Sequence, residues 1–174
     1  MMDVDLPPGA QPVDGAMQSE FVAPLAEAAG VAFREVAGSE IFLQTAFRIS
    51  TPVDFGDRSA LIELTFPSGP GALVLSVTDT AAQALASRVL AGQELTLDGP
   101  LVDDCLGEIS NVIAGQGKAM LWGTDRHYTF GTPRVASGPG RAALFGSRLN
   151  WIVLRFQSDL GLISLQITEV TSAK

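Results

Sequence analysis

The order of hydrophobic patterns predicts an α+β fold built from a duplicated unit of one helix and three strands. Two stretches with apolar residues at helical spacing, residues 19–36 and 101–121, are each followed by three short strand-like stretches. The two halves repeat with an offset of about 80 to 90 residues, as a duplicated unit would. Because each amphipathic helix must bury its apolar face, we expect both helices to pack on one face of a six-stranded, mostly antiparallel sheet.

The composition is that of a globular protein with an acidic surface. Hydrophobic residues make up 47% of the 174 residues and charged residues 17%, which argues against a disordered chain. The net charge of −8, with only 11 Lys and Arg, argues against nucleic acid or an anionic membrane as a partner. The single cysteine, Cys105, cannot form an intramolecular disulfide.

The N-terminal stretch differs in composition from the rest. Residues 1–18 are rich in Pro, Gly and Asp without periodicity, so we expect a disordered leader before one domain over residues 19–174. The stretch lacks the basic and apolar regions of a signal peptide, and no run approaches 18 apolar residues. A cytoplasmic location is therefore expected.

The first repeat begins with a helix for which Ser19 is a suitable N-cap, and Pro24 is tolerated because it lies near the start. Three strands follow and are expected to pair as an antiparallel meander: residues 41–49, 60–66 and 72–77. Asp79 can cap a short helix that Gly92 would end.

The second repeat begins with the helix over residues 101–121, which Gly99 and Pro100 open. Its three strands are expected at residues 128–135, 150–156 and 162–170. A flexible Gly-Pro-Gly turn at 138–140 separates the first two strands. We expect Trp122 and Trp151 in the core.

The second long helix carries an unusual polar stripe. At 100° per residue, Asp104, Glu108, Asn111 and Gly115 fall within an arc of about 60°. The opposite face is apolar and consists of Cys105, Leu106, Ile109, Val112, Ile113 and Met120. Most stripes of this kind are only a solvated surface. Gly107 and Gly115 leave room for the backbone of another molecule, however, so the stripe is also a candidate docking surface.

Other chemistry is poorly supported by the residues. The run from Gly115 to Lys118 is not a phosphate-binding loop, because that motif needs Gly at Val112 and Ser or Thr at Ala119. His127 is the only histidine, so no His-based metal cluster or Ser-His-Asp triad fits unless His127 is itself the base. We expect His127 to be a solvated loop residue, and we predict no metal site.

The series Asp104, Glu108, Asn111 resembles the signature of the CheC/CheX/FliY chemotaxis phosphatases, which has an Asp or Ser, then Glu four positions on, then Asn three further. The run GEISNVIAGQGKAML looks like the active-site helix of that family, and Pro133 fills the place of a Pro roughly two dozen residues later. The surrounding order of strands and short helix resembles the CheX branch, over about residues 20–170. The resemblance implies a CheC-like fold with one active helix, since Glu27 and Gly30 of the first repeat stand where Glu108 and Asn111 stand in the second.

The resemblance also implies an activity, which is hydrolysis of the phospho-aspartate of a CheY-like receiver domain. A carboxamide suits this reaction because its oxygen accepts a hydrogen bond from water while its NH₂ donates to a phosphoryl oxygen. Asn111 would position the water, Glu108 would bind the receiver's Lys, and Asp104 and Gly115 would belong to the docking surface. The protein would need no cofactor of its own, because the receiver supplies Mg²⁺. A homodimer formed through the sheet is also implied, and the long apolar C-terminal strands agree with it.

Two other functions stay open. The flagellar switch protein FliM resembles this architecture, so the chain could be a non-catalytic docking or structural module. The Glu108 and Asn111 pair favours the phosphatase, because a purely structural member would not need it. A small-molecule hydrolase is less well supported, since the sequence shows no second catalytic group and no phosphate cradle.

Overall fold

Eight antiparallel strands form one sheet in the computed structural model, which describes residues 5–91, 93 and 98–169. In chain order the strands are β1 (Gln11–Pro12), β2 (Ile41–Ile49), β3 (Arg58–Phe66), β4 (Gly69–Val77), β5 (Thr129–Phe130), β6 (Arg134–Ser137), β7 (Trp151–Ser158) and β8 (Gly161–Thr168). The helical elements are α1 (Gly15–Met17), the π-helical turn η1 (Gln18–Val22), α2 (Ala23–Ala37), α3 (Asp79–Val89), α4 (Gly99–Met120), the 3₁₀ turn η2 (Gly138–Gly140) and α5 (Arg141–Phe145).

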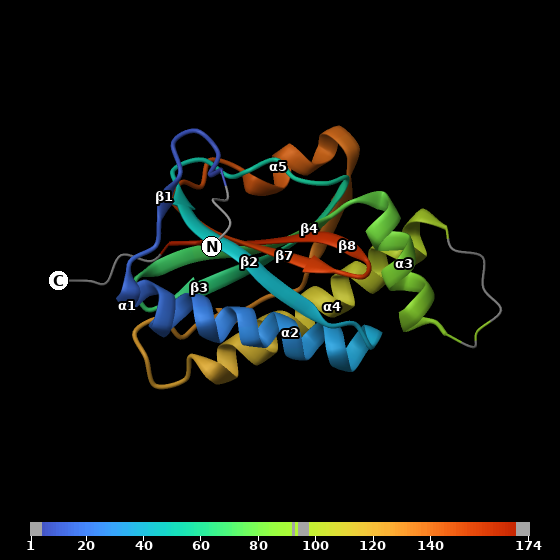
Figure 1. The fold of residues 1–174 in the computed structure, drawn as a ribbon, viewed down its shortest axis with the longest axis horizontal. Coiled ribbons are helices and arrows are strands. Elements are labelled where there is room, and N and C mark those ends of the chain that lie inside the picture. The colour runs from blue at the N-terminus through green and yellow to red at the C-terminus, as the bar shows by residue number, and fades with distance from the viewer. Residues whose placement is uncertain (1–4, 92, 94–97, 170–174) are drawn as a thin grey trace.

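The two long helices lie on the same face of the sheet, as the sequence predicts. Figure 1 shows α2 and α4 side by side on one face and α5 on the other. The α+β class and this layer arrangement are confirmed. The sheet has eight strands within the described residues rather than the expected six, because β1 is added and the expected strand over residues 128–135 is divided into β5 and β6.

The first strand of each repeat pairs with the hairpin of the other repeat. The hairpins β3–β4 and β7–β8 meet at the centre of the sheet, where β4 pairs with β8; β2 then pairs with β7, and β6 pairs with β3. The expected meander of the first three strands is therefore wrong, since β2 does not lie beside β3. Alternation of apolar residues shows which face of a strand is buried but does not select its neighbour. The exchange joins the two repeats into one sheet.

The first long helix begins before Ser19. Asp14 is the actual N-cap, and its Oδ1 accepts a hydrogen bond from the backbone N–H of Met17 at 2.7 Å. From there α1, η1 and α2 form one helical segment, which ends at Gly38 with a φ of 59°. The π-helical turn ends two residues before Pro24 and contains the carbonyl four residues earlier that the proline ring crowds, so the wider turn accommodates Pro24.

The N-terminal stretch differs from the disordered leader that its composition predicts. Gln11 and Pro12 of β1 pair with Arg48 and Phe47 of β2, and Leu6 packs against buried side chains of the sheet. Residues 5–18 therefore adopt a defined structure that the contact with β2 stabilises. The sequence did not predict this contact, because a strand of two residues is too short to show alternation of apolar and polar residues. Residues 1–4 lie outside the described residues.

Proline and glycine change the second repeat as well. Residues 131–133 interrupt the pairing with β3, where Pro133 has no N–H to donate, although the N–H of Gly131 still donates to the carbonyl oxygen of Glu63 in β3. The expected flexible turn at 138–140 is η2, and it leads into α5, which at five residues is too short to show periodicity. Thr78 rather than Asp79 caps α3, with its hydroxyl accepting from the N–H of Ala81. Gly92 and Val170, the expected ends of a helix and a strand, lie outside the described residues.

The main core lies between the sheet and the two long helices. It contains fully buried side chains from α4 and from the facing strands, among them Leu106, Ile109, Ile113, Ile62 and Leu165. Burying one such side chain contributes roughly 1.5–3 kcal/mol, so several together hold α4 firmly against the sheet. A smaller cluster around Trp151 lies on the opposite face under α5. Trp151 is buried as expected, whereas Trp122 is 73% exposed, because it lies in the turn after α4.

Candidate functional site

The start of α4 is fixed by a cap and by a charged cluster. Oδ1 of Asp98 accepts a hydrogen bond from the N–H of Leu101 at 2.9 Å, and Pro100 lies in the first turn as expected. Arg58 of β3 is largely buried and binds the carboxylates of both Asp103 on α4 and Asp79 on α3. The position of the N-terminal half of α4 is therefore set from two neighbouring elements.

The polar stripe faces outward, as the sequence predicts. Asp104, Glu108 and Asn111 are exposed, while Ile109 and Ile113 of the same helix are fully buried. Within the described part of the chain, no hydrogen bond or ion pair engages any of the three exposed side chains. The carboxylate and the carboxamide, one helical turn apart, are thus free to bind another molecule.

These residues line a groove of about 520 Å³. One side consists of α4 residues, with Asp103 and Gly107 beside the three residues of the motif. The other side is formed by the segment between β5 and β6 and the start of β6: Gly131, Thr132, Pro133 and Val135. Glu108 and Asn111 therefore belong to a concave surface and not only to a solvated helix face.

The second side of the groove packs directly on Gly107. A Cβ atom at Gly107 would lie 3.6 Å from both Pro133 Cγ and Val135 Cγ2. Gly107 is buried, so the space beside it is filled by the protein's own chain, and our expectation that it leaves room for a partner is wrong. The contact instead brings Pro133 next to the motif, which the sequence separation alone did not show.

Two other residues of α4 lie away from the groove. Gly115 does not line it and lies against the ring of Phe130, so its role in docking stays a prediction. Cys105 is buried, and this burial, together with the neighbouring Asp104 carboxylate, raises the pKa of its thiol. A thiol of that kind stays protonated near neutral pH and is not a nucleophile.

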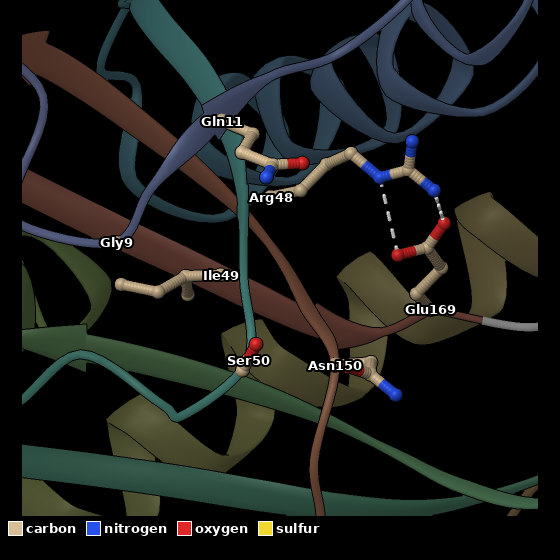
Figure 2. A pocket seen from close by; sticks show the side chains of 7 residues that line it. All are labelled: Gly9, Gln11, Arg48, Ile49, Ser50, Asn150 and Glu169. Atoms are coloured by element: carbon tan, nitrogen blue, oxygen red, sulfur yellow. Dashed lines mark hydrogen bonds and ion pairs between the residues drawn. The ribbon is translucent and has the colours of Figure 1, made fainter.

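A second hollow lies at the opposite edge of the sheet, where β1 meets β2. It measures about 280 Å³, and Figure 2 shows that its charged residues, Arg48 and Glu169, bind each other. Gln11 and Asn150 complete the polar lining. Because the two charges neutralise each other, this hollow is a weaker candidate than the groove on α4.

The remaining candidates do not form a site. His127 lies in the loop after α4, with its ring edge-on to Trp122 at 5.5 Å between centroids. In the described ranges, no three His, Cys, Asp or Glu side chains are grouped closely enough to hold a metal ion. No helix in those ranges has both the length and the apolar character needed to cross a membrane.

A family model decides the classification. The model for "Chemotaxis phosphatase CheX" matches residues 58–160, more than half of the chain, and this span contains the motif and both sides of the groove. The chain belongs to the CheX family. Among curated proteins, none matches this CheX-family chain significantly.

Solved structures agree with the CheX fold. The chemotaxis protein CheX from Vibrio vulnificus is 24% identical with a TM-score of 0.71, over 86% of this chain and 99% of that one. A CheX–CheY–BeF₃–Mg²⁺ complex from Borrelia burgdorferi contains a chain that is 18% identical with a TM-score of 0.68, over 85% and 96% of the two chains. The FliM middle domain from Vibrio alginolyticus is 12% identical with a TM-score of 0.59, over 87% and 91%. At these identities the likeness establishes the fold alone.

Proposed function

We propose that this CheX-family protein hydrolyses the phospho-aspartate of a CheY-like receiver domain. The observation that carries the proposal is the pair Glu108 and Asn111, exposed, unpaired within the described residues and one turn apart on a firmly packed helix. The groove beside the pair offers room for part of a partner protein. The complex from Borrelia burgdorferi, in which a CheX is bound to CheY, supports this kind of partner.

The proposed mechanism requires little covalent chemistry from this chain. An acyl phosphate has a good leaving group, so hydrolysis mainly needs a water molecule in line with phosphorus. The Asn111 carbonyl oxygen accepts a hydrogen bond from that water, and its NH₂ donates to a phosphoryl oxygen. The water oxygen bonds to phosphorus as the bond to the receiver's aspartate breaks, and the water proton leaves with the phosphate.

Glu108 has a different part in the proposal. Its carboxylate forms an ion pair with the active-site Lys of the receiver. This ion pair sets the position of α4 along its axis relative to the receiver's active site. Asp104, at the edge of the stripe, contributes to docking. The receiver brings its own Mg²⁺, so this chain needs no cofactor, and the cytoplasmic location expected from the sequence suits such a partner.

Glu108→Ala is expected to weaken binding of the phosphorylated receiver roughly 10-fold or more, because a paired charge at the interface is lost. The melting temperature should hardly change, since the side chain is exposed and makes no ion pair within the described residues. Titration of a labelled receiver measures the affinity. Glu27→Ala, an exposed residue at the matching place in the first repeat, is the control and should bind as wild type does. If the Glu108→Ala and Glu27→Ala proteins bind the receiver with equal affinity, the proposed role of Glu108 in receiver binding is wrong.

The activity itself is tested by a decay experiment. Candidate receiver domains from the same genome are phosphorylated with acetyl phosphate, and the loss of phosphate from each is followed with and without this protein. We expect accelerated decay for at least one receiver. If the protein accelerates the decay of no receiver, the alternative function gains support. That alternative is a non-catalytic docking module, and the FliM middle domain has a similar fold.

We also propose a homodimer, formed through the outer edge of β2. The long C-terminal strands β7 and β8 lie inside the sheet, so their apolar character reflects burial and they offer no edge. β1 covers β2 only at Phe47 and Arg48, so the outer edge of residues 41–46 has no strand partner among the described residues. Phe42 on that stretch is 62% exposed. An open strand edge of this kind favours pairing with another copy.

Light scattering at micromolar concentration should therefore report about 36 kDa, twice the 18.2 kDa of one chain. Phe42→Lys should shift the mass toward the monomer, because it places a charge on the open edge. A wild-type mass near that of one chain would contradict the dimer. A Phe42→Lys protein that stays dimeric would place the interface elsewhere.

A further inference from the structure

The second side of the groove is a short segment that is fixed at both ends. The N–H of Gly131 donates to the carbonyl oxygen of Glu63 at 3.0 Å. Two residues later, Pro133 packs on Gly107 of α4. Between these two contacts lies Thr132, which is exposed and lines the groove together with Glu108 and Asn111.

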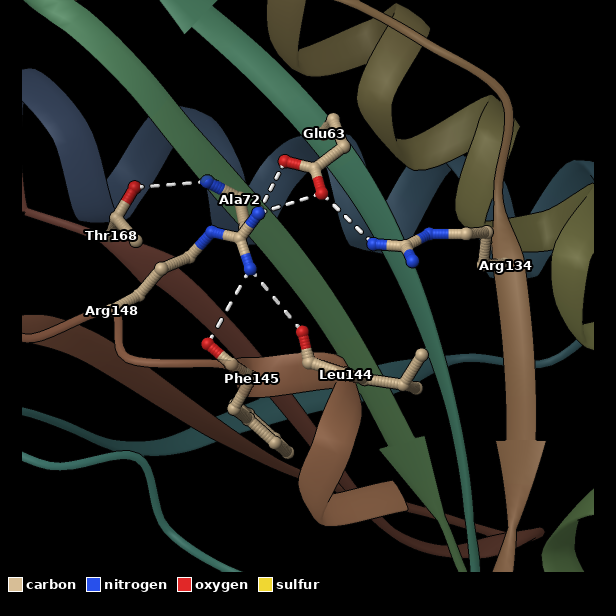
Figure 3. A network of polar contacts seen from close by, with 7 residues as sticks. All are labelled: Glu63, Ala72, Arg134, Leu144, Phe145, Arg148 and Thr168. Atoms are coloured by element: carbon tan, nitrogen blue, oxygen red, sulfur yellow. Dashed lines mark hydrogen bonds and ion pairs between the residues drawn. The ribbon is translucent and has the colours of Figure 1, made fainter. Parts of the chain in front are cut away.

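A network around Glu63 holds this segment to the sheet (Figure 3). The Glu63 carboxylate accepts hydrogen bonds from Nη2 of Arg134 at 2.9 Å and from Nη2 of Arg148 at 2.6 Å. Nη1 of Arg148 also donates to the carbonyl oxygens of Leu144 and Phe145 in α5. Partly exposed ion pairs of this kind add little stability. Their geometric effect matters more, because Gly131 and Arg134, on either side of Thr132, are both bound to Glu63.

The backbone that carries Thr132 is consequently held on the side of the groove opposite Glu108 and Asn111, and the Thr132 hydroxyl is exposed there. It can donate one hydrogen bond and accept others, and it has no partner within the described residues. A polar group on a fixed backbone loses little conformational entropy when it binds a partner. The motif on α4 cannot supply this contact, because its residues lie on the other side of the groove.

We infer that Thr132 is a partner-binding residue whose hydroxyl forms a hydrogen bond with a polar group of the receiver domain beside α4. The inference rests on the proposed function, because the receiver is the partner it names. Thr132 takes no part in the hydrolysis step itself. Its removal should therefore change the affinity for the receiver and leave the turnover of the bound complex unchanged.

Thr132→Val tests this contact because valine nearly keeps the shape and lacks the hydroxyl. The affinity for a receiver activated with beryllium fluoride and Mg²⁺ is measured by calorimetry, and KM and kcat are measured with the phosphorylated receiver. We expect Kd and KM to rise roughly 3- to 10-fold, as for loss of one neutral hydrogen bond, with kcat within about twofold of wild type. Thr132→Ser keeps the hydroxyl and should retain the wild-type affinity. Thr129→Val is the matched control, since Thr129 is also exposed but lies outside the groove.

The outcomes separate this inference from the proposed function. The inference is wrong if Thr132→Val binds the receiver as tightly as wild type does, or if Thr129→Val loses as much affinity as Thr132→Val. Neither result contradicts the phosphatase activity, as long as the wild-type protein dephosphorylates the receiver. If the protein binds an activated receiver but does not dephosphorylate it, the phosphatase is wrong, and the affinities of the variants still decide the role of Thr132. If no receiver binds, both are wrong.

Discussion

Asn111→Ala should lower the rate of receiver dephosphorylation roughly 100-fold or more while binding of the receiver survives. The estimate follows from the cost of removing one preorganised hydrogen-bonding group at a reaction centre. Asn111 is exposed on a helix whose other face is buried, so the substitution should leave the fold and the melting temperature nearly unchanged. The decay of the phosphorylated receiver measures the rate, and calorimetry with the receiver activated by beryllium fluoride measures binding.

Asn111→Asp is a harsher version of the same test. It keeps the shape of the side chain but replaces the NH₂ donor with a negatively charged oxygen facing an anionic phosphoryl group. This variant should also be nearly inactive. If both variants accelerate the decay as wild type does, the water-positioning role of Asn111 is wrong. If wild type itself accelerates the decay of no receiver but still binds one, the non-catalytic docking module is supported instead.

Gly117→Ala is expected to destabilise the protein by roughly 2–4 kcal/mol and to lower the melting temperature by about 5–15 °C. A Cβ atom at Gly117 would lie 2.4 Å from Oη of Tyr128, which cannot move freely because it is fully buried and donates to the carbonyl of Ala114 at 2.8 Å. Burial also raises the pKa of Tyr128, so this hydroxyl keeps its proton. Thermal unfolding followed by circular dichroism measures the change.

Two further variants show whether the cause is this contact. Gly30→Ala, in the matching helix α2, has no atom within 4 Å of the added Cβ and should stabilise the protein by about 0.5–1 kcal/mol. Combining Gly117→Ala with Tyr128→Phe removes the clashing oxygen. The double variant should therefore lose less free energy of unfolding than the sum of the losses in the two single variants. Strictly additive losses would show that the close approach of Tyr128 is not the source of the effect.

Local patterns were sufficient for the elements that are long and amphipathic. The face of α4 that carries Glu108 and Asn111 follows from 3.6-residue periodicity alone, because a helix must bury its apolar side whatever its neighbours are. The same reasoning placed Cys105 in the core. The series Asp104, Glu108 and Asn111 also resembles the signature of the CheC/CheX/FliY chemotaxis phosphatases, and the match of residues 58–160 to the CheX family model confirms that resemblance.

The exchange of β2 and β6 between the repeats, the β1 strand and helix α5 depended on contacts between residues far apart in the chain. Short elements have too few positions to show a period, and alternation does not name a strand's neighbour. The groove needed tertiary structure for the same reason: Gly107 was expected to leave room for a partner, yet it accommodates Pro133, which lies beside it only because β5 and β6 pair with β3. The exposed pair Glu108 and Asn111 could thus be predicted from one helix, whereas the opposite side of the groove, including Thr132, is formed only when the chain folds.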